Sequence, residues 1–172
     1  PVGMGGSLGR TEATGFGVIY TVREALNELG IDIKNTSAAF QGFGNVSQYA
    51  VKLYQEYGGK AVCVSCWDQK DNKSYTFTKK SGIDLQQLLG ITDKFGGIDK
   101  GKAKDLGYEV ADAEAWIQQE VDILVPAALE NQINAATVDR ISSKVKIIAE
   151  GANGPTTPEG DEVVKKRNTF GI

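Results

Sequence analysis

The chain has 172 residues, with 19 basic and 22 acidic side chains and a formal net charge of −3. This length is enough for one domain with a sizeable core, and 41% hydrophobic with 24% charged residues argues against disordered, collagen-like and coiled-coil chains. The balanced charge gives no broad positive field for nucleic acid or anionic lipid, and the apolar stretches are too short to span a bilayer, so we expect neither partner.

Helical and extended patterns alternate along the chain, which predicts an α/β layer fold with a largely parallel sheet. Apolar residues at helical spacing predict a helix over 11–29, ended by Gly30. A short strand over 37–40, a glycine turn, a helix over 46–57 and a buried strand through Cys63 follow. These elements form one βαβ unit.

The next part of the chain is more polar. Tyr75 and Phe77 alternate with threonines and indicate a small edge strand, and 84–89 fits one or two helical turns. The segment 93–105 mixes lysines, aspartates and glycines, and we interpret it as an exposed, solvated loop.

The last third returns to regular patterns, without an internal repeat or a domain linker. We predict, in order, a helix over 111–119, a buried strand over 121–125, a helix over 131–141, a strand over 145–149, and a final helix with Thr157 as N-cap and Pro158 at its first position.

Two cysteines, Cys63 and Cys66, form a C-x-x-C pattern. The redox version of this pattern needs the first thiol at a helix N-terminus, whereas Cys63 falls in a β-branched, apolar strand. Side chains three apart on a strand point to opposite faces, so the two sulfurs do not meet. We therefore expect inert, buried thiols and no metal site. The chain contains no histidine, which excludes serine triads and histidine-ligated zinc here. Reduced thiols fit a cytoplasmic location.

The glycine turn Gly42-Phe-Gly44-Asn-Val-Ser47 follows a predicted strand and opens a helix, as the dinucleotide-binding motif requires. Gly42 permits the tight turn, and Gly44 lets a pyrophosphate approach backbone N–H groups without meeting a Cβ atom. Ser47 replaces the third glycine, which serves helix–strand packing and tolerates a small side chain. The turn predicts a Rossmann-like, doubly wound α/β fold, with a mostly parallel sheet and helices on both faces, although a plain tight turn is the alternative.

An acidic residue that binds the adenosine ribose is expected at the end of the second strand. Asp68 stands there, 24 residues after Gly44. No arginine lies near Asp68 in the sequence to bind a 2′-phosphate, although Lys70 and Lys73 are close to it. The sequence therefore slightly favours NAD over NADP.

Three further segments resemble the glutamate dehydrogenases, which belong to the Glu/Leu/Phe/Val dehydrogenase superfamily. They are Gly5–Gly17 (GGSLGRTEATGFG), Pro126–Ile133 (PAALENQI) and Glu150–Glu159 (EGANGPTTPE). With Gln41–Val46 (QGFGNV) between them, the resemblance runs in order along nearly the whole chain. The third segment resembles the glutamate enzymes more than the branched-chain or aromatic ones.

The resemblance implies reversible oxidative deamination of L-glutamate to 2-oxoglutarate and ammonia, with hydride transfer to nicotinamide. Carried onto matching positions, it places these residues at the cofactor: Thr14 and Asn153 near the nicotinamide, Gly42, Phe43, Gly44, Asn45 and Val46 at the pyrophosphate, and Ala127 and Ala128 along its path. It leaves the role of Arg10 open, between function and a structural salt bridge.

The resemblance further implies that 1–172 is one dinucleotide-binding domain of a longer enzyme. The substrate domain, with the catalytic lysines and aspartate, would precede Pro1, and C-terminal helices would follow Ile172. We therefore expect no catalytic residue in this chain and no turnover by it alone. Full-length relatives are commonly homo-hexamers, which leaves a monomer open for the fragment.

Two residues, Ser47 and Cys66, depart from the family pattern. Many relatives have an acidic residue where this chain has Cys66, and this second departure bears on the choice between NAD and NADP. Two alternatives stay open. One is a leucine, phenylalanine or valine dehydrogenase domain, and the other is a nucleotide-sensing module without chemistry.

Overall fold

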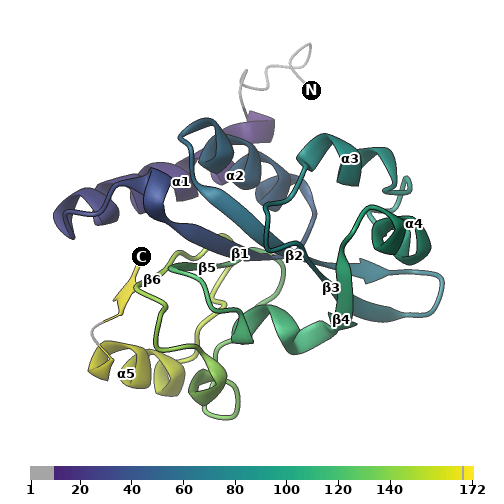
Figure 1. Ribbon diagram of the computed structural model, residues 1–172. Helices are drawn as coiled ribbons and strands as arrows, with labels where there is room; N and C mark the ends of the chain where they lie inside the picture. The colour runs from purple at the N-terminus through teal and green to yellow at the C-terminus, as the bar shows by residue number, and fades with distance from the viewer. Residues whose placement is uncertain (1–9, 168) are drawn as a thin grey trace, which may run out of the picture.

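A seven-stranded sheet runs through the residues that this computed structural model describes, 10–167 and 169–172, in the order β4-β3-β2-β1-β5-β6-β7 (Figure 1). In chain order the strands are β1 (Ser37–Gln41), β2 (Lys60–Asp68), β3 (Lys73–Thr78), β4 (Glu109–Asp112), β5 (Ile123–Pro126), β6 (Ile147–Ile148) and β7 (Phe170–Gly171).

The sheet reverses its winding direction at β1. β1 pairs in parallel with β2 on one side and with β5 on the other, and β6 and β7 continue in parallel beyond β5. Within the described sheet only β3 runs in the direction opposite to the other strands, antiparallel to β2 and to β4. The expected mostly parallel, doubly wound fold is confirmed, and its switch point lies between β1 and β5.

Helices cover both faces of the sheet (Figure 1). On one face lie α1 (Arg10–Glu28), α2 (Asn45–Glu56), α3 (Leu85–Gly90) and α4 (Lys100–Asp105). The other face carries α5 (Pro158–Lys166) and the 3-10 helices η3 (Ala113–Gln118) and η4 (Val138–Arg140), while a third, η2 (Ile33–Asn35), precedes β1. Each face has its own apolar core, so the central strands β1, β2 and β5 are buried on both sides.

A close contact between helices places α1 beside the start of α2. A Cβ atom added to Gly15 would lie 2.5 Å from the Val46 carbonyl oxygen and 2.8 Å from Tyr49 Cβ. Only glycine permits this approach, and the T-shaped contact of Phe16 with Tyr49 extends it, with ring centroids 5.7 Å apart.

Four sequence predictions need correction. β3 is not an edge strand, because β4 pairs along its outer side. The region predicted as a helix over 111–119 is instead the end of β4 followed by η3, since pairing with β3 overrides the local pattern. The segment 93–105 is not a solvated loop throughout, because α4 forms within it and Ile98 and Ala103 are buried.

The fourth correction concerns the predicted helix over 131–141. The structure has the short η4 there, because Ile133 pairs in a parallel bridge with Thr156 of the loop before α5 and Asn131 has a φ of +57°, and neither fits a helix. Asn131 and Ile133 donate their backbone N–H groups to the carbonyls of Gly154 and Pro155 at 3.0 and 2.9 Å. The last helix is as expected, with the Thr157 hydroxyl accepting the N–H of Gly160.

The two cysteines belong to different cores. Cys63 packs on the α5 face and Cys66 on the α1–α2 face, as the alternation of side chains on β2 predicts. Burial raises the pKa of the Cys63 thiol to about 12 and that of Cys66 to about 11. Both thiols are therefore protonated at neutral pH, which makes them poor nucleophiles.

We expect both thiols to react with a disulfide reagent at pH 8 about a hundredfold or more slowly than free cysteine, because a raised pKa lowers the thiolate fraction and burial blocks access. Titration with Ellman's reagent measures this, and the same titration in guanidinium chloride gives the unfolded reference. A native thiol that reacts as fast as the unfolded chain would contradict the packing of β2.

Candidate functional site

The carboxyl ends of β1 and β5 meet at the switch point, where open α/β sheets bind ligands. Gly42 follows β1 and Ala127 follows β5, and the Ala127 N–H donates to the Gln41 carbonyl at 3.0 Å. A Cβ atom added to Gly42 would lie 3.0 Å from Ala128 Cβ. The glycine turn and the segment after β5 are thus in direct contact.

A left-handed glycine and an inward hydrogen bond fix the conformation of the turn. Gly42 has a φ of +99°, a conformation that favours glycine, and its N–H donates to the buried Ser65 hydroxyl at 3.0 Å. The Phe43 side chain is buried in the core, and its carbonyl accepts a 2.7 Å hydrogen bond from the Gln48 side chain. Phe43 can therefore contribute only its backbone to a ligand.

Gly44 is the N-cap of α2, and it provides no side-chain cap for the helix. The first N–H groups of a helix have no carbonyl partner within it, and together with the helix dipole they favour an anion. A Cβ atom added to Gly44 would meet no atom of the described residues within 4 Å. The position that a Gly44 side chain would take is therefore unoccupied by described residues, which leaves room there for a phosphate group of a dinucleotide.

The loop after β6 completes this edge of the sheet. The N–H groups of Gly151 and Ala152 both donate to the Pro126 carbonyl at 3.0 Å. A Cβ atom added to Gly151 would lie 3.0 Å from Ala127 Cβ and 3.3 Å from Val46 Cγ1. The segments that resemble one family, far apart in the sequence, therefore meet at the start of α2.

The sequence-predicted residues differ in what they can offer a ligand. Thr14, Asn45, Ala128 and Asn153 are exposed, as is Gly44, while Val46 and Ala127 are half-buried. Residues 5–9 and the Arg10 side chain lie outside the described residues, so the role left open for Arg10 cannot be placed.

Asp68 lies apart from the turn, at the last position of β2, as expected for a ribose-binding acid. Its side chain is only 8% exposed and pairs with Lys100 Nζ at 2.5 Å, while the Lys70 N–H donates to its other oxygen at 2.9 Å. The hydrogen bond from Lys100 and the one from Lys70 lower the pKa of the Asp68 carboxyl, which is ionised at neutral pH.

Sequence reasoning missed three residues of the site. Ser65 holds the Gly42 amide from inside β2, Gln132 accepts a 2.7 Å hydrogen bond from the Gln41 side chain, and Lys100 comes from a segment interpreted as a loop. None belongs to a local motif, because each acts across the fold over 23 residues or more.

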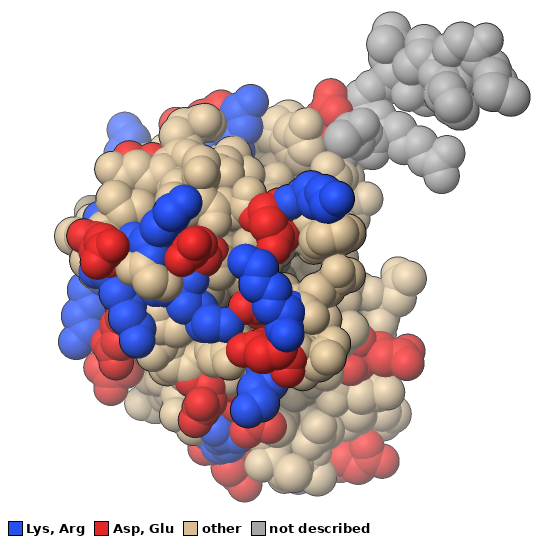
Figure 2. Space-filling view, turned by 90° about the vertical axis from the view of Figure 1, so that its right-hand side faces the viewer, with Lys and Arg blue, Asp and Glu red and all other residues tan. Residues whose placement is uncertain are grey.

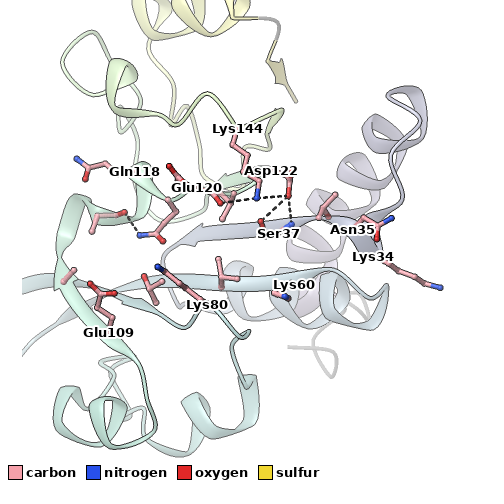
Figure 3. Close-up of a pocket in the computed structure, with 17 residues that line it drawn as sticks. Lys34, Asn35, Ser37, Lys60, Lys80, Glu109, Gln118, Glu120, Asp122 and Lys144 are labelled. Carbon is pink, nitrogen blue, oxygen red and sulfur yellow. Dashed lines mark hydrogen bonds and ion pairs between the residues drawn. The ribbon is translucent and has the colours of Figure 1, made fainter.

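A separate hollow of about 780 Å³ lies at the opposite, amino-terminal edge of the sheet (Figure 3). Lysines and acidic residues line it together, and its buried Asp122 already accepts hydrogen bonds from the Ser37 N–H and hydroxyl. It has no glycine turn, and it lies at the edge of the sheet where such folds do not bind nucleotides.

The described part of the chain offers neither a metal-binding cluster nor a membrane-spanning helix. No group of three or more histidine, cysteine, aspartate or glutamate residues is arranged there to hold a metal ion. No helix in that part combines the length and apolarity needed to cross a membrane.

The sequence matches the family described as Glutamate/Leucine/Phenylalanine/Valine dehydrogenase over residues 5–171. It is 44% identical over 168 residues to the NAD-specific glutamate dehydrogenase of Clostridioides difficile, and 43% identical over 168 residues to the glutamate dehydrogenase of Thermotoga maritima. Each alignment covers 97% of this chain and 38% of the relative.

Solved structures agree with these matches. The crystal structure of glutamate dehydrogenase from Peptoniphilus asaccharolyticus is 38% identical with a TM-score of 0.74, covering 100% of this chain and 36% of that one. Tryptophan dehydrogenase from Nostoc punctiforme, at 20% identity and a TM-score of 0.66 over 95% of this chain and 41% of that one, shares the fold. The chain spans about 38% of the length of the curated relatives it matches.

Two buried serines allow a matched test of the turn. Ser65→Ala should cost about 1–3 kcal/mol of unfolding free energy, because it leaves the Gly42 N–H buried without a partner. Ser47→Ala should be neutral or slightly stabilising, since the buried Ser47 hydroxyl has no partner among the described residues. Guanidinium unfolding measures both values. Equal losses would show that the Ser65–Gly42 hydrogen bond does not stabilise the turn.

Proposed function

We propose that this chain, which belongs to the Glutamate/Leucine/Phenylalanine/Valine dehydrogenase family, is the dinucleotide-binding domain, residues 1–172, of an NAD-dependent glutamate dehydrogenase. The observation that carries the proposal is the open space in front of Gly44. A helix N-terminus without a side-chain cap lies at the switch point of the sheet, where a diphosphate would fit.

Different proposed residues would contact different parts of the cofactor. Backbone N–H groups of Phe43, Gly44, Asn45 and Val46 would bind the diphosphate, and Gly42 would shape the turn. Thr14 and Asn153, both exposed, would lie towards the nicotinamide, and Ala127 and Ala128 would line the path between them and the turn. When bound, the nicotinamide would accept the hydride from the amino acid.

The remainder of the reaction is proposed for the rest of such an enzyme. Because the chain spans about 38% of its curated relatives, we propose that the groups that bind L-glutamate and 2-oxoglutarate lie outside the matched part. We also propose a homo-oligomeric enzyme. A Thermus thermophilus relative is described as a hetero-hexamer, although at 20% identity it shows the fold alone.

NAD is the proposed cofactor in preference to NADP. Two relatives, from Clostridioides difficile and Peptoniphilus asaccharolyticus, are named NAD-specific at 44% and 40% identity. The acidic Asp68 at the end of β2 supports the same choice. The alternative amino acids and a purely sensory module have no described feature that favours them.

Gly44→Val tests the diphosphate site. The added side chain would meet no described protein atom but would occupy the proposed phosphate position, so we expect unchanged folding and a loss of NAD affinity above about 2 kcal/mol. Isothermal calorimetry measures the affinity and thermal unfolding checks the fold. Gly90→Val is the matched control, because a Cβ atom there also has no described neighbour within 4 Å. Unchanged NAD affinity in Gly44→Val would remove the turn from the account.

A second test separates cofactor binding from catalysis. The chain alone should bind NAD in calorimetry but show no glutamate-dependent absorbance increase at 340 nm, because the proposed substrate groups lie elsewhere. Robust formation of NADH by the purified chain would contradict the proposed division of labour.

A further inference from the structure

A small network of charges surrounds the carboxylate that ends β2. Lys100 Nζ lies 2.5 Å from Asp68 Oδ2 and 3.0 Å from Asp71 Oδ2, and 4.2 Å from the centre of the Tyr75 ring. The Tyr75 hydroxyl donates to the same Asp71 oxygen at 2.5 Å. Lys100 thus bridges the two acids and rests on an aromatic face, although it comes from α4, a distant part of the chain.

The network stands where the adenosine half of a dinucleotide would reach. β2 is the parallel neighbour of β1, so its carboxyl end lies on the same edge of the sheet as the glycine turn. A hollow of about 430 Å³ is lined by Gln69 and Lys70, which follow Asp68 in the chain, and by Asp93, Lys94 and Phe95. Phe95 is 59% exposed and offers a flat apolar surface of the kind that an adenine ring stacks on.

Both oxygens of Asp68 are already engaged by protein donors. The Lys70 N–H binds Oδ1, and Lys100 binds Oδ2. With 8% of the side chain exposed, the carboxylate has little surface left for ribose hydroxyls. The Lys100 side chain is 32% exposed, so it is the more accessible member of the pair.

The charge balance at this position depends on Lys100. Asp68 and Asp71 carry two negative charges, and the ammonium group that contacts both neutralises one of them. On the wider face around α3, α4, β3 and β4, basic and acidic side chains are interleaved (Figure 2), so no broad field of one sign outweighs this local pairing. Discrimination between a 2′-hydroxyl and a 2′-phosphate is therefore set locally.

We propose that Lys100 is a specificity-determining residue of the cofactor site, and that it weakens the discrimination of this chain against NADP by pairing with Asp68. This inference rests on the proposed function and adds the residue that tunes the choice of cofactor. Without Lys100, Asp68 and Asp71 keep no ion-pair partner among the described residues and would repel a 2′-phosphate, which carries a charge of about −2 near neutral pH. The neutral 2′-hydroxyl of NAD meets no such repulsion.

The test is calorimetric titration of NAD and NADP into the purified chain. Lys100→Met should raise the Kd for NADP about tenfold or more and change the Kd for NAD by less than about threefold. Lys100→Arg should restore the original ratio of the two constants, because it keeps the charge. Asp68→Asn should change the ratio in the opposite direction, towards NADP.

A matched control comes from the same helix. Lys102→Met removes one charge from an exposed position two residues away, on another side of α4, and should leave the ratio unchanged. If Lys100→Met weakened both cofactors equally, Lys100 would be merely structural and the inference would be overturned. It would also be overturned if the wild-type chain bound NAD without measurable affinity for NADP.

The two proposals fail in different ways. A wild-type chain that bound neither dinucleotide would overturn the proposed function together with this inference. A chain that bound NAD, lost it in Gly44→Val, and kept its NADP-to-NAD ratio in Lys100→Met would retain the function and lose only the role of Lys100.

Discussion

The N-terminus of α2 imposes the constraint on which the rest of the site depends. The first N–H groups of a helix have no carbonyl partner within it, and Gly44 adds no side chain at this position. Gly44 leaves that position open, Gly42 turns the chain into it, and Ser65 fixes the turn from behind. The segments after β5 and β6 then pack around it through the contacts of Gly42 and Gly151.

Much of this arrangement could be predicted from local signals. The strand, turn and helix around Gly42 have periodic burial and glycines at fixed positions, and the capping signal at Thr157 depends on its immediate neighbours alone. The Rossmann-like fold and the cofactor edge follow from these features and from the resemblance. Opposite placement of Cys63 and Cys66 likewise follows from the alternation of a strand.

The remainder depends on contacts between distant segments. Asn131 and Ile133 are held by backbone hydrogen bonds to the loop before α5, so the helical pattern over 131–141 yields the short η4 instead of a full helix. β4 forms because the outer side of β3 was open to pairing. In the sequence, Lys100 is one of several lysines in a polar segment. Its ion pair with Asp68 forms because the folded chain brings the start of α4 to the end of β2. Such outcomes are set by tertiary structure rather than by local propensity.

A crystal structure of the chain with bound NAD would test the central claim most directly. We expect diphosphate oxygens within about 2.7–3.2 Å of the amides that begin α2, with the adenosine extending towards the end of β2. A dinucleotide bound in the hollow at the amino-terminal edge, or a turn whose amides are blocked by side chains, would contradict it.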